Sequence, residues 1–214
     1  FTPQCALEPF CGRGTTPVEL QNHQIRCYSF EISPFMYLLA KVKLDRADEV
    51  DTLARYIKAV SVQLEHPVDD IRSIESVPFG DTVVRREGMK KWNFHDSALD
   101  GLLDVRNAIR TKVDDEKYRN LFSIALASII LQSSNLFRNG KCLSYKKSWK
   151  ERVLSRTDVH KLFLGKLNTI ITEDVNVIAK ESSLVHNSED CYFGDVRKNI
   201  EKLPDACLDL IITS

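Results

Sequence analysis

The sequence predicts an α/β fold, in which an open parallel sheet built from strand–helix–strand units is interrupted by a mostly helical insertion. Short apolar segments bounded by turn residues lie near both ends of the chain and alternate with helical patterns. Between them, residues 46–185 carry apolar residues mostly at helical spacing, together with charged loops. The chain is therefore predicted to form one sheet domain from residues 1–45 and 186–214, with residues 46–185 as the insertion.

The first half of the predicted sheet occupies the N-terminal segment. Residues 5–7 are apolar and suit a buried strand, which a glycine-containing turn follows. Pro17 then stands at an early helical position, where proline is tolerated, and predicts a helix start. Residues 25–30 predict a second strand that ends at Glu31, and residues 35–44 predict a second helix.

Helices dominate the predicted insertion. Helical spacing of apolar residues predicts them over residues 48–65, 118–131 and 149–181, the last as one helix or as two consecutive ones. Prolines, glycines and charges fill residues 66–95, where we expect loops and a short hairpin around residues 82–85.

The second half of the predicted sheet lies at the C-terminal end. Residues 190–193 predict a strand, residues 196–202 a short helix, and residues 208–212 a final buried strand. The sheet domain thus has two strands on each side of the insertion.

Composition excludes several classes of protein. Apolar residues make up 43% and charged residues 28% of the chain, as in ordinary globular proteins. Lys plus Arg equals Asp plus Glu at 30 each, so any nucleic-acid binding must come from a local basic patch. The six cysteines form no C-x-x-C pair, which argues against a zinc site and favours an intracellular, cytoplasmic location. We expect no membrane span and no bound metal.

The glycine turn after the first strand predicts a cofactor site. In Phe10-x-Gly12-x-Gly14, glycines let the backbone approach a ligand, and the following helix offers free N–H groups to a carboxylate. Glu31, which lies 17 residues after Gly14, is placed to accept hydrogen bonds from two ribose hydroxyls. Asp195 follows the third strand and is placed to contact an adenine amino group. The alternatives are a turn that only joins strand to helix, and a nicotinamide dehydrogenase, whose fingerprint has a third glycine that is missing here.

These motifs resemble those of the S-adenosylmethionine-dependent DNA amino-methyltransferases. LEPFCGRGTT resembles motif I of that family, usually DPFxGxGTT, with Glu8 in place of Asp; FEISP resembles motif II and FGDV motif III. The resemblance covers residues 5–44 and 190–214 and implies a Rossmann-like class I methyltransferase sheet with S-adenosylmethionine as its cofactor. It implies cofactor contacts at Phe10, Cys11, Gly12, Gly14, Thr15, Glu31 and Asp195. Cys11 also invites comparison with the nucleophile of cytosine-C5 methylation, but a packing contact beside the cofactor is the favoured interpretation.

The last residues, DLIITS, resemble the strand that leads into motif IV, which reads Ser/Asp-Pro-Pro-Tyr in this family. The resemblance implies that Ser214 is the catalytic residue and that it holds the exocyclic amine of a flipped base, with cytosine N4 as the target. Since the sequence stops before Pro-Pro-Tyr and starts with Phe1, we expect a piece of a longer protein that is active in its full-length form and inactive as given.

A basic segment in the insertion is the candidate DNA contact. Residues 138–152 hold six basic residues, two aromatic residues and one acid. The candidate contacts are Arg138, Lys141, Tyr145, Lys146, Lys147, Trp149 and Lys150. A solvated connector between two helices, with Trp149 as an anchor, is the alternative. The position of the insertion between motifs I and IV resembles that of a target-recognition region.

The resemblance implies double-stranded DNA as the partner, within a bacterial restriction-modification system that includes a cognate restriction endonuclease. Methylation of adenine N6 or of RNA stays open as an alternative activity. A non-catalytic module that binds cofactor or nucleic acid is the rival from another class.

Overall fold

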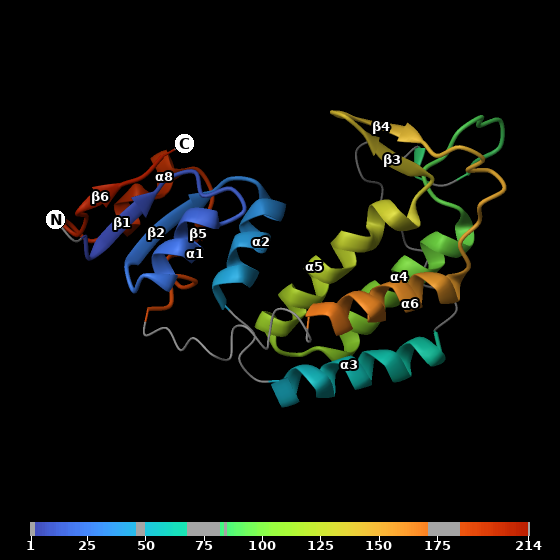
Figure 1. The fold of residues 1–214 in the computed structure, drawn as a ribbon, viewed down its shortest axis with the longest axis horizontal. Helices are drawn as coiled ribbons and strands as arrows, with labels where there is room; N and C mark the ends of the chain where they lie inside the picture. The colour runs from blue at the N-terminus through green and yellow to red at the C-terminus, as the bar shows by residue number, and fades with distance from the viewer. Residues whose placement is uncertain (1–2, 46–49, 68–81, 84, 171–184, 214) are drawn as a thin grey trace. The chain divides into compact units, whose positions relative to one another are not determined.

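The computed structural model describes residues 3–45, 50–67, 82–83, 85–170 and 185–213, and it divides into two compact units (Figure 1). Unit 1 comprises residues 1–48 and 175–214, and unit 2 comprises residues 49–174. The described elements of unit 1 are β1 (Cys5–Glu8), α1 (Thr15–Asn22), β2 (Arg26–Glu31), α2 (Pro34–Asp45), β5 (Cys191–Phe193), α8 (Val196–Asn199), the 3-10 helix η3 (Ile200–Lys202) and β6 (Leu210–Ile211). Those of unit 2 are α3 (Val50–Glu65), α4 (Asp96–Lys112), α5 (Glu116–Ser133), β3 (Leu136–Asn139), β4 (Cys142–Tyr145) and α6 (Arg156–Thr169).

Unit 1 is built on a parallel four-stranded sheet in the order β5-β2-β1-β6 (Figure 1). In chain order this is third, second, first, fourth, so the direction of strand addition reverses between β1 and β6. The predicted α/β class with a parallel sheet is thereby confirmed. In open sheets of this kind, ligands bind beyond the carboxyl ends of the strands at such a reversal.

Alternating side chains give the sheet two buried faces. Ala6 and Cys27 pack with Leu20 of α1 on one face. Leu7 and Tyr28 face the opposite side, where a second apolar cluster adds residues from β5, α8 and the segment that follows η3. The sheet is therefore buried on both sides, as expected for parallel strands.

A buried polar network fastens α1 to the sheet. Asn187 is fully buried, and its Oδ1 accepts from the N–H of Cys27 at 2.9 Å while its Nδ2 donates to the carbonyls of Pro17 and Ile25. Its own N–H donates to Oε1 of the buried Gln21 at 2.8 Å. These hydrogen bonds join Asn187, which follows the insertion, to α1 and β2, which precede it.

Unit 2 packs its helices around α4, which contacts α3, α5 and α6. At Gly101 of α4, an added Cβ would lie 2.8 Å from Cβ of Val159, so a glycine is needed where α6 crosses. One turn along, Asp104 is 3% exposed and binds two side chains of α6. Its carboxylate accepts from Arg156 at 2.5 and 2.6 Å and from Nε2 of His160 at 2.9 Å.

Two predicted elements of unit 2 differ in the structure. The helix predicted from residue 149 begins only at Arg156, because Ser155 and Asp158 form a capping box there, and its predicted continuation over residues 171–181 lies outside the described residues. The hairpin predicted at residues 82–85 lies partly outside them; Thr82 has 3-10 helical geometry and Val83 lies in a turn.

A hairpin is instead found at β3 and β4, which overlaps the basic segment of residues 138–152 that was predicted to contact DNA. Asn139 pairs with Cys142, which leaves a two-residue loop. The first loop residue, Gly140, has a φ of +60°, which glycine adopts readily and which tight hairpin turns require.

Candidate cofactor site

The predicted cofactor residues lie in three segments that follow neighbouring parallel strands of unit 1. The turn of residues 9–14 follows β1, Glu31 ends β2, and Asp195 comes two residues after the end of β5. Because β1, β2 and β5 are adjacent and parallel, these segments lie at one edge of the sheet. The predicted catalytic residue, Ser214, lies outside the described residues.

Backbone hydrogen bonds fix the turn after β1. The N–H of Cys11 donates to the carbonyl of Phe30 in β2 at 2.9 Å, and the N–H of Gly14 donates to the carbonyl of Cys11 at 2.8 Å. The buried Glu8 accepts from the N–H of Phe10 at 3.2 Å. Glu8, which stands where motif I usually has Asp, therefore stabilises the turn.

The two glycines of this turn meet different surroundings. Gly12 has a φ of +53°, and a Cβ added there would have nothing within 4 Å. Gly14 has a φ of +78°, and a Cβ added there would lie 2.8 Å from Cβ of Ala40 in α2. Gly12 thus leaves open space beside the backbone for a ligand, whereas Gly14 lets α2 pack against the turn.

Replacing Gly14 by Ala is expected to destabilise unit 1 by about 3 kcal/mol, since the left-handed backbone and the overlap with Ala40 each cost about 1–2 kcal/mol. Gly12→Ala is the matched control in the same turn, and it should cost only about 1–2 kcal/mol because its Cβ meets open space. Hydrogen exchange of the amides of β1 and β2 measures both losses. Equal losses in the two variants would rule out the packing contribution.

The start of α1 is suited to an anion. Gly14 is the N-cap residue and offers no side-chain cap, and the first turn of this described helix, which begins at Thr15, contains no acidic residue. The N–H groups and the positive end of the helix dipole are therefore left to a ligand carboxylate.

In the part of the chain that the structure describes, the carboxylate of Glu31 accepts a hydrogen bond at only one of its two oxygens. Its Oε1 accepts from the N–H of Ser33 at 2.7 Å, which orients the side chain. Oε2 accepts no hydrogen bond from the described residues, and the side chain is half-buried. The geometry leaves one carboxylate oxygen to receive hydroxyl donors.

Asp195 is more fully engaged than the sequence indicated. It caps α8 by accepting from the N–H of Arg197 at 3.0 Å, and both of its oxygens also bind the Arg197 guanidinium, at 2.6 to 3.1 Å. The hydrogen bonds from Arg197 lower the pKa of Asp195 to about 2. A ligand amine at Asp195 would have to share this carboxylate with Arg197.

Large apolar side chains are exposed beside these polar groups. Phe10 after β1 is 61% exposed, Ile32 after β2 is 66% exposed, and Phe193 at the end of β5 is 50% exposed. Glu31 of β2 is paired with Phe193 of β5, so the next residue of each strand, Ile32 and Gly194, lies just beyond this pair. Exposed apolar side chains at the carboxyl ends of these strands form a surface that the flat apolar part of a ligand can cover. The predicted cofactor contacts include Phe10 but not Ile32 or Phe193, although these two lie in the segments that resemble motifs II and III.

Cys11 is part of the packing behind the turn. It is 7% exposed and packs with Cys191 and Ala40. A thiol–thiol hydrogen bond with Cys191, followed by burial, raises the pKa of Cys11 above its usual value. A buried protonated thiol is a poor nucleophile, so this environment favours the packing interpretation.

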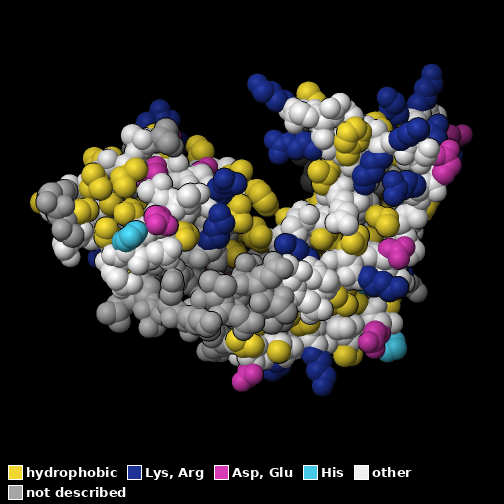
Figure 2. Space-filling model, in the orientation of Figure 1, with side chains coloured by type: hydrophobic (Ala, Val, Ile, Leu, Met, Phe, Trp, Pro, Cys, Tyr) yellow, Lys and Arg dark blue, Asp and Glu magenta, His cyan; other side chains and the backbone are white. Residues whose placement is uncertain are grey.

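The residues predicted to contact DNA lie in unit 2, on and after the β3–β4 hairpin. Arg138, Lys141, Lys147 and Lys150 are exposed. Figure 2 shows Lys and Arg side chains gathered over this end of unit 2. They form a basic surface to which a polyanion is attracted.

The two aromatic candidates are less accessible. Trp149 is 9% exposed, and its ring lies edge-on to Trp92 at 4.6 Å and beside Tyr145 at 5.1 Å. Tyr145 is half-buried and donates to Oδ1 of Asn93 at 3.2 Å. These contacts anchor the hairpin, whereas the connector alternative had Trp149 anchor the helix that follows.

Lys146 binds the C-terminal end of α5. Its ammonium donates to the carbonyls of Gln132 at 2.9 Å and Ser134 at 2.5 Å, and burial lowers its pKa. Lys146→Gln is therefore expected to destabilise unit 2 by about 2 kcal/mol, because two carbonyls lose a charged donor. The exposed Lys147, replaced by Gln, should change stability by less than about 0.5 kcal/mol. Urea unfolding followed by tryptophan fluorescence compares the two, and similar losses would contradict the capping role.

Comparison with family models, with curated protein sequences and with solved structures found no match to this chain. Among the described residues, no helix has both the length and the apolar character needed to cross a bilayer. Nor do three or more His, Cys, Asp or Glu side chains come together as a possible metal site in that part of the chain.

Proposed function

We propose that unit 1 binds S-adenosylmethionine and that the protein transfers its methyl group to the exocyclic amine of a flipped DNA base, cytosine N4 being the preferred target. One observation carries the cofactor proposal. At neighbouring carboxyl ends of a parallel sheet, an open glycine turn lies beside Glu31, whose second carboxylate oxygen is left for a ligand.

The residues present fit the parts of this cofactor. The start of α1 would hold the methionine carboxylate, and Glu31 would accept from the ribose hydroxyls. Ile32 and Phe193 would cover the adenine ring, with Asp195 near its amino group. When bound, the cofactor supplies an electrophilic methyl group on its sulfonium.

The catalytic half of the proposal depends on the resemblance of the last residues to motif IV. Ser214 would accept from the exocyclic amine of the base and hold its lone pair toward the methyl group. Most of the rate increase would then come from positioning and electrostatics. No covalent enzyme–base bond is needed, which agrees with the buried thiol of Cys11.

The activity is tested by mass spectrometry of nucleosides from host DNA after expression of the full-length gene. N4-methylcytosine that is absent from an empty-vector control supports the proposal, and the Glu31→Gln variant should reduce that signal. N6-methyladenine would move the target to adenine. No methylated DNA base, from a folded protein that binds S-adenosylmethionine, would favour an RNA substrate or a non-catalytic module.

A further inference from the structure

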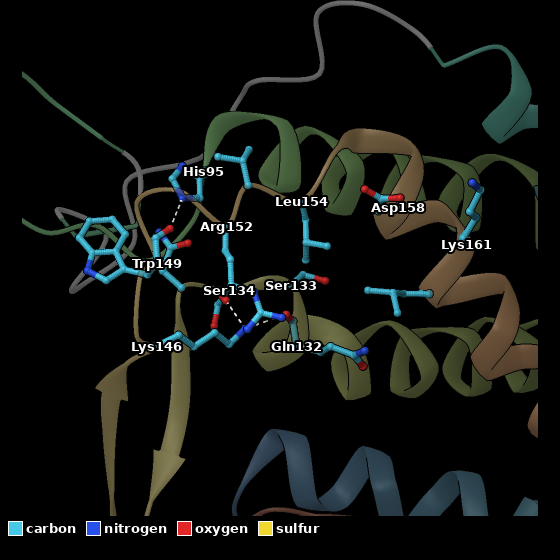
Figure 3. Close-up of a pocket in the computed structure, with 13 residues that line it drawn as sticks. His95, Gln132, Ser133, Ser134, Lys146, Trp149, Arg152, Leu154, Asp158 and Lys161 are labelled. Atoms are coloured by element: carbon cyan, nitrogen blue, oxygen red, sulfur yellow. Dashed lines mark hydrogen bonds between the residues drawn. The ribbon is translucent and has the colours of Figure 1, made fainter.

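A pocket of about 610 Å³ lies within unit 2 (Figure 3). Its walls are the C-terminal end of α5, the segment between β4 and α6, and the first turns of α6. Ser133, Lys146, Arg152, Asp158 and Lys161 are among the residues that line it, and Figure 3 shows them around one hollow. Pockets of this volume bind small-molecule ligands.

Positive charge is in excess in this pocket. Lys146, Arg152 and Lys161 line it, whereas Asp158 is its one acidic lining residue among those described. Asp158 is already engaged, because its Oδ2 accepts from both the N–H and the hydroxyl of Ser155. Burial is the main cause that lowers the pKa of Lys146, and the positive charge of Arg152 lowers it further. These two cations therefore lie close enough to repel each other. An anion between them would relieve that repulsion.

Ser133 provides a second, independent observation. The residue is 3% exposed, and its Oγ has no hydrogen-bond partner among the described residues, although it lines the pocket. Buried hydroxyls are nearly always paired, and an unpaired one in a native protein calls for an explanation. A ligand oxygen in the pocket would accept from this hydroxyl.

We propose that this pocket binds a phosphate group of the DNA backbone, held by Arg152 and the hydroxyl of Ser133. A guanidinium and a hydroxyl both donate to the acceptor oxygens of a phosphate. The choice of DNA as the source rests on the proposed function, and on the exposed basic residues Lys147 and Lys150, which continue the positive surface beyond the pocket. Arg152 lies in the basic segment of residues 138–152 but was not among the predicted DNA contacts, and Ser133 lies outside that segment.

Fluorescence anisotropy with a labelled 20-bp duplex, titrated at several salt concentrations without cofactor, tests this proposal. Arg152→Gln should weaken binding about tenfold and lower the salt slope by about 0.9, as expected for one lost phosphate contact. Ser133→Ala should weaken binding about threefold to tenfold with an unchanged salt slope, because no charge is lost. Its fold should be as stable as that of the parent chain, since the hydroxyl has no partner to lose.

Lys166→Gln is the matched control, because it removes one charge from the same helix at an exposed site outside the pocket lining. It should keep DNA affinity within about twofold. Unchanged DNA affinity and salt slope in both the Arg152 and Ser133 variants would overturn the proposal.

Two further arms separate the alternatives. Titration with ATP identifies a free nucleotide as the phosphate source, and the DNA assignment falls if Arg152→Gln loses ATP binding but keeps DNA binding. Glu31→Gln should leave DNA affinity within about twofold, because Glu31 belongs to unit 1 and carries no phosphate contact. Failure of cofactor binding with an intact pocket would therefore remove the methyltransferase proposal without removing the phosphate site.

Discussion

Replacing Glu31 by Gln is expected to weaken S-adenosylmethionine binding by roughly 30-fold or more. The change removes the charge that would receive the ribose hydroxyls, and hydrogen bonds to a charged group contribute about 1.5–3 kcal/mol each. The glutamine carbonyl can still accept from the N–H of Ser33, so the local backbone keeps its 2.7 Å hydrogen bond. The loss should therefore appear in affinity and not in folding.

Glu19→Gln is the matched control for this variant. Glu19 is an exposed carboxylate of α1 in the same unit, and its partner is His23, 3.3 Å away on the same helix. Calorimetric titration should show unchanged affinity for it, within about twofold. If Glu31→Gln bound as tightly as the control, Glu31 would have no part in the cofactor site.

Replacing Asp104 by Asn is expected to destabilise unit 2 by about 3–5 kcal/mol. The carboxylate is almost fully buried, and it neutralises Arg156 while accepting from His160. Removing one partner of a buried ion pair leaves the other charge uncompensated, and this penalty exceeds the loss of the hydrogen bonds alone. Because α4 and α6 meet at this pair, the cost applies to the packing of both helices.

Urea unfolding followed by tryptophan fluorescence measures this loss, because the chain's two tryptophans, Trp92 and Trp149, both lie in unit 2. The exposed Glu116 of α5 provides a control, and Glu116→Gln should change stability by less than about 0.5 kcal/mol. A loss below about 1 kcal/mol for Asp104→Asn would mean that the pair contributes little, as exposed pairs do.

The sheet of unit 1 was accessible from sequence because its signals are local. The strands at Cys5–Glu8 and Arg26–Glu31 are short apolar segments, and each is bounded by a turn that the composition reveals. Gly12 and Gly14 need positive φ, and a glycine turn between strand and helix predicts this directly. The exposure of Ile32 and Phe193 could not be predicted in the same way, because it depends on which strands pair and in which register.

The helices of unit 2 were harder to predict for a physical reason. Helix α4 places Gly101 and Asp104 at buried positions, where a periodicity search expects large apolar residues. Both residues serve the contact with α6, which is distant in sequence. The hairpin at residues 136–145 did carry a signal, the glycine at position 140, but its strands are largely exposed and lack the apolar alternation that identifies a strand.

DNA contacts in the basic segment of residues 138–152 were hard to predict for the same reason. Lys146 and Trp149 carry the residue types of a DNA contact, yet Lys146 binds carbonyls of α5 and Trp149 packs on Trp92. Charge and aromatic content are visible in sequence, whereas the partner of each side chain is set by tertiary packing.

Calorimetric titration of the folded chain with S-adenosylmethionine, with NAD as a parallel ligand, tests the central claim most directly. We expect saturable binding of S-adenosylmethionine at one site, weakened by Glu31→Gln and by Gly12→Ala, and no binding of NAD. Absence of S-adenosylmethionine binding by a chain that hydrogen exchange shows to be folded in β1 and β2 would contradict it.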